Sequence, residues 1–240
     1  MLPITCYKPL HNTRVTVWRI PLEVTGAELD ACRSVLSAEE IERTERFRFE
    51  WLKRRYIVSH GHMRAILSQY AGIPASELFF QTTKFGKPYL DPAFGVQFNL
   101  SHSGELAILA AGTNELGADI ELIRPLDDFE SIAANFFSAR EASELHCYPA
   151  PERLRAFYRC WTRKEAFVKA AGEGLSIPLT SFVVSLGEER AELLEITPPE
   201  HASDWTIATL DLGPDYVGAL AARGKPSAIE IRSWSGLHPS

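Results

Sequence analysis

The pattern of apolar and polar positions along the chain predicts a mixed α+β protein. Residues 13–21, TRVTVWRIP, alternate along the chain and are rich in β-branched side chains, which favours a strand. Residues 50–72 carry apolar side chains on one helical face, and a glycine and a proline follow, as at the end of a long helix. Ser37 and Ser138 each precede a glutamate by three positions, so both predict the capped start of a shorter helix.

Further strands and a second long helix are predicted along the rest of the chain. Residues 96–112, VQFNLSHSGELAILAAG, predict two strands joined by a polar SHSG turn, and residues 115–125 predict another strand. A second long helix is expected from about residue 151 to residue 171, with β-like stretches after it. ELAILAAG and YVGALAARG resemble each other across the two parts. We therefore expect two similar α+β halves, residues 1–115 and 116–225, and a C-terminal tail, residues 226–240.

Composition narrows the functional classes. The chain has 240 residues and a formal net charge of -6, which argues against a general nucleic-acid binder. No apolar run is long enough to span a bilayer, and the N-terminus lacks a signal-peptide pattern, so no membrane partner is expected. The cysteines form no CxxC pair, which favours a reducing, cytoplasmic location without a zinc or disulfide framework. They are Cys6, Cys32, Cys147 and Cys160.

The sequence GADIE holds the first candidate for chemistry. Asp119 and Glu121 are two residues apart on a predicted strand and therefore share one face. Burying two carboxylates there is costly unless a positive charge meets them. Mg²⁺, which prefers oxygen ligands and often bridges carboxylates to phosphates, meets that need. The alternative is an edge strand whose acidic side faces water.

The SHSG segment holds the second candidate. Ser101 and His102 offer a hydroxyl and an imidazole, both able to donate hydrogen bonds to phosphate oxygens. The alternative is a plain hairpin turn built from small polar residues. A serine–histidine nucleophile pair is disfavoured, because adjacent residues of an extended chain point apart and no GxSxG elbow is present.

The second long helix holds the third candidate. Trp161, Glu165 and Lys169 recur every four residues and form one stripe. The alternative is a surface ion pair between Glu165 and Lys169, which stabilises a helix by only about 0.2–0.5 kcal/mol. The basic region of residues 43–64 has a similar alternative, a solvated face interleaved with glutamates.

Four segments, in this order, resemble the Sfp-type members of the 4'-phosphopantetheinyl transferase superfamily: FGKPYL, FNLSHSG, GADIE and WTRKEAFVKAAGEGL. FFSAREASEL is similar to a fifth segment of that family. The resemblance covers roughly residues 37–186. Enzymes of this family transfer the phosphopantetheine arm of coenzyme A to a serine of acyl or peptidyl carrier proteins. These carriers serve fatty-acid, polyketide and nonribosomal-peptide biosynthesis.

The resemblance implies roles for the matching residues of this chain. Asp119, Glu121 and Glu165 match the Mg²⁺ ligands, and Glu165 is also the expected acceptor of the serine proton. Glu165, Lys169 and His102 form the expected catalytic set. Glu40 stands where some members have a lysine, so the grip on the ribose phosphate is expected to rest on nearby arginines. The residues expected to bind coenzyme A are Arg43, Arg55, Lys87, Pro88, Ser101, His102, Lys164 and Lys169.

The resemblance also implies an architecture and a reaction. The fold is expected to be a pseudo-dimer of two α+β subdomains, each a small antiparallel sheet with a long helix, and the ligand cleft lies between them. A monomer is expected. The reaction consumes coenzyme A and releases adenosine 3',5'-bisphosphate. Two alternatives remain: an Mg²⁺-dependent phosphohydrolase that acts on coenzyme A, and a non-enzymatic module that binds the carrier or the coenzyme.

Overall fold

A computed structural model describes residues 13–172, 174–197 and 201–237. Cys6 and the N-terminal residues on which the expectation about a signal peptide rests lie outside these ranges. In the part described, no helix is both long and apolar enough to cross a membrane. The helices are α1 (Gly26–Ser34), α2 (Ala38–Thr44), α3 (Glu50–Ala71), α4 (Phe129–Phe136), α5 (Ala139–Cys147) and α6 (Ala150–Ala171).

The predicted strands are present in the expected order, together with two short strands within residues 81–89 that were not predicted. They are β1 (Val15–Pro21), β2 (Gln81–Thr82), β3 (Pro88–Tyr89), β4 (Gln97–Ser103), β5 (Leu106–Gly112), β6 (Leu116–Leu122), β7 (Phe182–Val184), β8 (Leu193–Ile196), β9 (Trp205–Leu210), β10 (Tyr216–Arg223) and β11 (Ile229–Ser233). Both predicted capping boxes are present, at Ser37 with Glu40 and at Ser138 with Glu141. The long helices end at Gly72 and Gly172, where the chain turns left-handed.

Two main sheets reveal the internal duplication. The first has the order β11-β1-β5-β4 and the second has the order β6-β10-β9. In the first sheet β1 pairs with β5, and β5 pairs antiparallel with β4. In the second sheet β6 pairs with β10 in the same way, and β10 pairs antiparallel with β9. Two short hairpins, β2 with β3 and β7 with β8, complete the pairing within the described residues. The predicted α+β fold with two similar subdomains is therefore confirmed.

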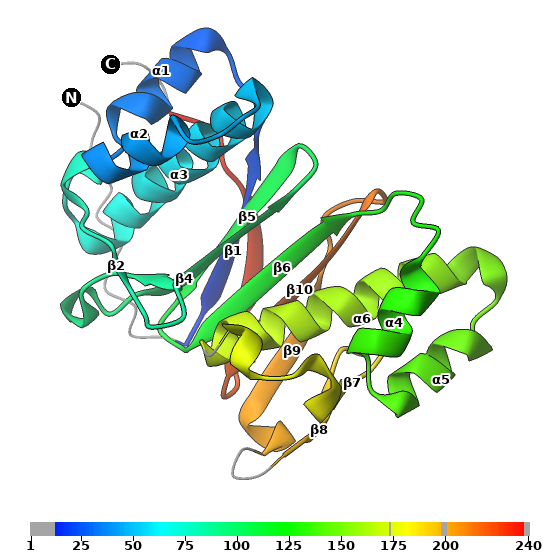
Figure 1. The fold of residues 1–240 in the computed structure, drawn as a ribbon. Coiled ribbons are helices and arrows are strands. Elements are labelled where there is room, and N and C mark those ends of the chain that lie inside the picture. The colour runs from blue at the N-terminus through cyan, green and yellow to red at the C-terminus, as the bar shows by residue number, and fades with distance from the viewer. Residues whose placement is uncertain (1–12, 173, 198–200, 238–240) are drawn as a thin grey trace.

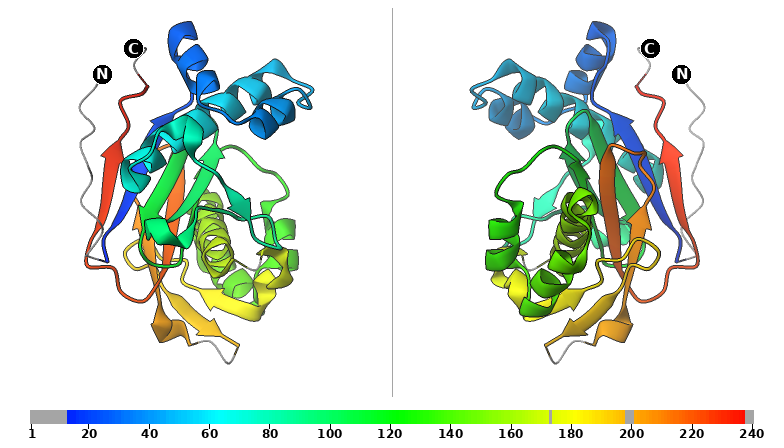
Figure 2. Two further views of the ribbon diagram at one scale, coloured as in Figure 1. Left: turned by 90° about the vertical axis from the view of Figure 1, so that its left-hand side faces the viewer. Right: turned by 90° about the vertical axis from the view of Figure 1, so that its right-hand side faces the viewer.

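The two sheets lie between two groups of helices (Figures 1 and 2). Helix α3 packs on the first sheet and α6 on the second, and each contact buries its own apolar cluster. A third cluster, which includes Val17, Ile108, Ala118 and Leu220, joins residues of both sheets. Because burial of apolar area is the main favourable term in folding, this shared cluster makes the halves one folding unit.

Strands β4 and β6 meet along the boundary between the halves. The Asn99 side chain accepts a hydrogen bond from the amide of Ala118 at 2.8 Å. The Ser103 hydroxyl accepts one from the amide of Leu122 at 3.0 Å. Ser101 and His102 thus lie in a strand, not in the turn that their composition suggested. The reason is that alternate polar side chains of β4 satisfy groups on β6.

The C-terminal segment returns to the first half. Within residues 226–240, expected to form a tail, β11 pairs in parallel with β1. Beyond β11, the Trp234 indole donates a hydrogen bond to Nδ1 of His62 on α3 at 2.9 Å. Its ring packs edge-on against Trp18 of β1. The alternating pattern of this segment therefore marks a strand that covers the edge of β1.

Gly117 of β6 allows α6 to approach the strand closely. A side chain at this position would overlap the main chain of Ala166 and Ala170. Gly117→Ala should therefore lower the free energy of unfolding by about 2–3 kcal/mol, since an overpacked site must move backbone. Urea denaturation measures this change. Gly187→Ala is the matched control, because a methyl group there meets nothing within 4 Å; equal losses in the two variants would contradict the packing argument.

Candidate active site

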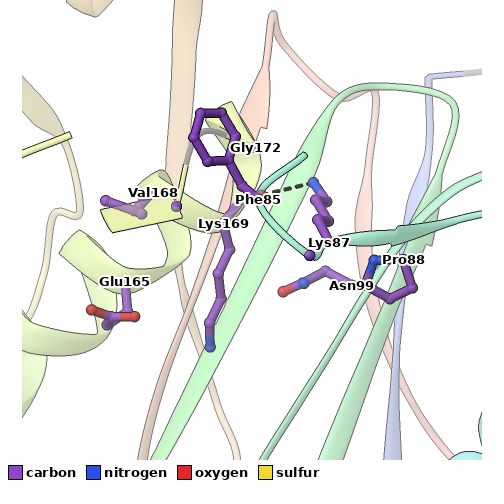
Figure 3. Close-up of a pocket in the computed structure, with 10 residues that line it drawn as sticks. Phe85, Lys87, Pro88, Asn99, Glu165, Val168, Lys169 and Gly172 are labelled. Atoms are coloured by element: carbon purple, nitrogen blue, oxygen red, sulfur yellow. Dashed lines mark hydrogen bonds between the residues drawn. The ribbon is translucent and has the colours of Figure 1, made fainter. Parts of the chain in front are cut away.

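A cavity of about 250 Å³ lies between the two halves, beside the C-terminal half of α6 (Figure 3). The first half contributes a turn and one residue of β4, and the second half contributes α6 and the loop after it. Of the predicted site residues, Lys87, Pro88, Glu165 and Lys169 line the cavity. The remaining lining residues are Phe85, Gly86, Asn99, Val168, Gly172 and Gly174. The expected cleft between the halves is thus present.

Lys169 joins the two halves at this site. Its ammonium lies 2.5 Å from Oδ1 of Asp119 and donates to the Ser101 hydroxyl at 3.1 Å. The Ser101 hydroxyl in turn donates to the same Asp119 oxygen at 2.9 Å. Lys169 therefore bonds to β6 and β4, and not to Glu165 one turn earlier on its own helix. The alternative of a simple helix-surface ion pair does not describe this contact.

Three carboxylates gather around this contact. Oδ2 of Asp119 is buried and has no hydrogen-bond partner among the residues that the structure describes. Burial raises the pKa of Glu165, and the charges of Asp119 and Glu121 raise it further. Burial also raises the pKa of Glu121, although its hydrogen bond from Ser103 at 2.8 Å opposes the shift. Such a cluster favours a cation, because each ionised group destabilises the others.

The three carboxylates of the acidic cluster do not converge on a single metal position. Among the residues that the structure describes, no three His, Cys, Asp or Glu side chains are already arranged to hold a metal ion. The donor set nevertheless suits Mg²⁺, which takes oxygen ligands and keeps several waters. The unpartnered oxygen of Asp119 is the clearest sign of this fit.

His102 lies on the opposite face of β4 from Ser101, toward α3. Burial lowers its pKa, and the nearby charges of Arg55 and Lys169 lower it further. Arg55 stacks over Trp51 at 4.7 Å and forms an ion pair with Glu105. Two cationic side chains, each paired with an acid, therefore lie near His102.

Arg43 lies farther along the basic region. Its guanidinium stacks over the ring of Tyr56 at 5.4 Å, and that ring stacks on His60 at 3.7 Å. Arg43 lines a separate hollow with Arg46, Phe47 and the acids Glu39 and Glu42. Arg46 pairs with Glu42 at the surface, as the alternative of a solvated face predicted, and Lys53 pairs with Glu45. Arg64 is buried and pairs with Glu40, so it does not belong to a solvated face. Glu40, at the position where some relatives have a lysine, is therefore held by Arg64 and by the α2 cap.

Lys164 does not reach the cavity, which corrects the expectation that it binds coenzyme A. Its fully buried ammonium lies 2.8 Å from the buried Glu141 and donates to the carbonyls of Leu179 and Phe182. Lys164 and Glu165 are consecutive on α6, so their side chains leave the helix about 100° apart. Glu165 faces the cavity, and Lys164 ties α6 to α5 and β7.

Two polar residues at the contact between β4 and β6 were not identified as site residues from the sequence. Asn99 and Ser103 lie two positions either side of Ser101 and share its face of β4. Asn99 lines the cavity and binds β6, and Ser103 binds both Glu121 and the Leu122 amide. The alternation of polar residues in FNLSHS was the signal that could have located them.

Comparison with known proteins identifies the class. Residues 115–221 match the family described as the 4'-phosphopantetheinyl transferase superfamily, and residues 23–114 match the family of 4'-phosphopantetheinyl transferase N-terminal domains. Similarity to individual members extends over most of the chain. The chain belongs to the 4'-phosphopantetheinyl transferase superfamily and is an enzyme of the Sfp type.

Three relatives illustrate the similarity. The 4'-phosphopantetheinyl transferase HetI of Nostoc sp. is 35% identical over 219 residues, which cover 90% of each chain. The 4'-phosphopantetheinyl transferase psf-1 of Bacillus pumilus is 34% identical over 88% of this chain and 89% of its own. The 4'-phosphopantetheinyl transferase Sfp of Bacillus subtilis is 33% identical over 79% of this chain and 83% of its own.

The acidic cluster should lower the stability of the protein without metal. The pKa of Glu165 is raised in the folded state, so its stabilising effect is complete below the pKa of the unfolded chain and is lost as pH rises through the folded value. At pH 7.5 the ionised group is therefore unfavourable. Glu165→Gln should raise Tm by a few degrees, since 1 kcal/mol corresponds to roughly 2–4 °C for a chain of this size.

Thermal unfolding with and without Mg²⁺ measures both effects. Mg²⁺ should raise the Tm of the wild type and should raise that of Glu165→Gln much less. Glu130→Gln, which changes a partly exposed carboxylate outside the cluster, is the control. A lower Tm for Glu165→Gln than for the wild type in metal-free buffer would contradict the electrostatic argument.

The buried ion pair between Lys164 and Glu141 should contribute to the stability of the fold. Lys164→Met leaves Glu141 buried without its cation, which should lower the free energy of unfolding by about 3–5 kcal/mol. Arg140→Met, at the residue next to Glu141 on α5, breaks an exposed pair with Glu195 and should cost at most about 1 kcal/mol. Chemical denaturation compares the two variants, and equal effects would show that burial does not matter here.

Proposed function

We propose that this protein transfers the 4'-phosphopantetheine of coenzyme A to a serine of an acyl or peptidyl carrier protein, with Mg²⁺, and releases adenosine 3',5'-bisphosphate. The observation that carries the proposal is the contact at the cleft between Lys169 of α6, Asp119 of β6 and Ser101 of β4. This contact brings a lysine, a hydroxyl and buried carboxylates together, as transfer of a phosphorylated group requires.

The positive side of the cleft suits the phosphates of coenzyme A. Burial lowers the pKa of His102 most, and the nearby charges of Arg55 and Lys169 lower it further, which supports the binding of an anion beside it. A phosphate placed at Lys169 would accept hydrogen bonds from Lys169 and Ser101, and His102, on the other face of β4, would donate to a different phosphate of the coenzyme. Arg43 extends the positive surface and is proposed to hold the ribose phosphate.

The carboxylates supply the metal site of this proposal. Asp119, Glu121 and Glu165 would hold Mg²⁺, and the unpartnered oxygen of Asp119 is the donor that most needs a cation. Bound there, Mg²⁺ supplies positive charge to the phosphate oxygens and to the leaving group. Lys169 adds a second positive charge beside the same oxygens.

The transfer itself moves one phosphoryl group. The serine oxygen of the carrier forms a bond to the β-phosphorus of coenzyme A, and the bond from that phosphorus to the bridging oxygen breaks. The electron pair stays on the departing adenosine 3',5'-bisphosphate. Glu165 is proposed to accept the serine proton, directly or through a metal-bound water, because its carboxylate lines the cavity beside Lys169.

A transfer assay tests the proposal. Apo carrier proteins of several types are incubated with the enzyme, coenzyme A and Mg²⁺, and the carriers are then weighed by mass spectrometry. Each modified carrier should gain one phosphopantetheine. Asp119→Asn and Lys169→Met should each lower kcat/KM by roughly 10²-fold or more, the scale seen when one preorganised electrostatic contact is lost.

The controls separate the alternatives. Asp215→Asn changes an exposed aspartate outside the site and should retain full activity. Phosphopantetheine released without any carrier would indicate a phosphohydrolase instead. Binding of coenzyme A and carrier without turnover would indicate a binding module.

A further inference from the structure

The turn at residues 83–88 reaches from the first half of the chain to the C-terminal end of α6. The turn is held internally: the amide of Thr83 donates to the Lys87 carbonyl at 2.9 Å, and the Lys87 amide donates to the Thr83 hydroxyl at 3.2 Å. Gly86 takes the left-handed conformation that the tight turn needs. The base of the Lys87 side chain is therefore fixed.

The Lys87 ammonium is bound to main chain on two elements of the other half. It donates to the carbonyl of Leu116 at 2.9 Å. It also donates to the carbonyl of Lys169 at 2.7 Å (Figure 3). Leu116 begins β6, three residues before Asp119, and Lys169 lies in the last turn of α6, four residues after Glu165. One side chain thus joins the strand and the helix that carry the acidic cluster.

This position suits a cation for a structural reason. The last carbonyls of a helix have no partner within the helix, and the negative end of its dipole lies there. Within the described residues, both hydrogen-bond acceptors of the Lys87 ammonium are main-chain carbonyls. Burial lowers the pKa of Lys87 to about 8, so much of its hydration has been exchanged for these two bonds.

We propose that Lys87 is a positioning residue that sets the register of α6 against β6, and thereby the placement of Glu165 and Lys169 relative to Asp119. This role differs from the direct hold on coenzyme A that the resemblance implied for Lys87. Without the two bonds, the last turn of α6 loses a cap, and the two elements can slide along each other. A displacement of about 1 Å at reacting groups can cost 10²-fold in rate.

Hydrogen exchange tests the structural part of the proposal without any assay of transfer. In Lys87→Met the amides in the last turn of α6, followed by mass spectrometry of a peptide spanning residues 162–172, should exchange at least 5–10-fold faster. Lys87→Arg keeps two donors on a side chain of similar reach and should retain wild-type exchange within about 3-fold. Lys84→Met is the matched control, because Lys84 lies in the same turn but is exposed and rests on the Phe85 ring.

Kinetics test the consequence for catalysis, which rests on the proposed function. Lys87→Met should lower kcat by 10–100-fold and change KM for coenzyme A by less than 3-fold. Lys87→Arg should restore most of kcat, and Lys84→Met should change neither constant. If the wild type modifies no carrier at all, the proposed function fails, whereas the exchange experiment still decides the role of Lys87.

Two results would overturn the inference. One is wild-type exchange in the last turn of α6 of Lys87→Met. The other is a large rise in KM for coenzyme A with kcat unchanged, which would indicate a direct contact with the coenzyme. If Lys87→Met does not fold, Lys87→Arg decides: a raised KM with wild-type exchange and kcat would contradict the positioning role in the same way.

Discussion

The close packing of α6 on β6 is the contact on which the rest of the site depends. Gly117 has no side chain, so the helix backbone lies directly on the strand at Ala166 and Ala170. This approach places Lys169 2.5 Å from Asp119 and puts Glu165 within the field of both acids of the strand. A larger residue at Gly117 would push α6 away from β6. Lys169 and Glu165 of the helix would then move away from Asp119 of the strand.

The packing of α6 on β6 also brings acidic groups together whose charges repel one another. Glu165 and Glu121 have raised pKa values, and Asp119 keeps a buried oxygen without a partner. The opposite side of α6 behaves differently, since the buried pair of Lys164 and Glu141 is satisfied by carbonyls and amides. One face of the helix is therefore held by satisfied polar contacts, whereas the face that carries Glu165 lies among acids whose charges oppose one another. Strain of this kind is expected at a functional site.

The duplication of the fold does not duplicate the chemistry. Both halves have the same strand order, with a long helix on the outer face of each sheet. On β6 the residues that face the helix are small or acidic, whereas on β1 Trp18 and Ile20 pack into the cluster under α3. Strand β11 and Trp234 then cover the outer edge of β1. The first half thus contributes Ser101 to the contact with Lys169 and Lys87 to the lining of the cavity, whereas the acidic side chains come from the second half.

The sequence by itself determined the elements and the candidate chemistry. Capping boxes, helix-ending glycines and period-two alternation depend on near neighbours, so Ser37, Ser138, Gly72 and Gly172 could be interpreted locally. The motifs also located the carboxylates and Lys169. Only the tertiary structure decided that Lys164 turns into the core, that Lys87 binds the end of α6, and that residues 226–240 include a strand of the first sheet. Each of these depends on a partner far along the chain, and no local pattern contains the position of that partner.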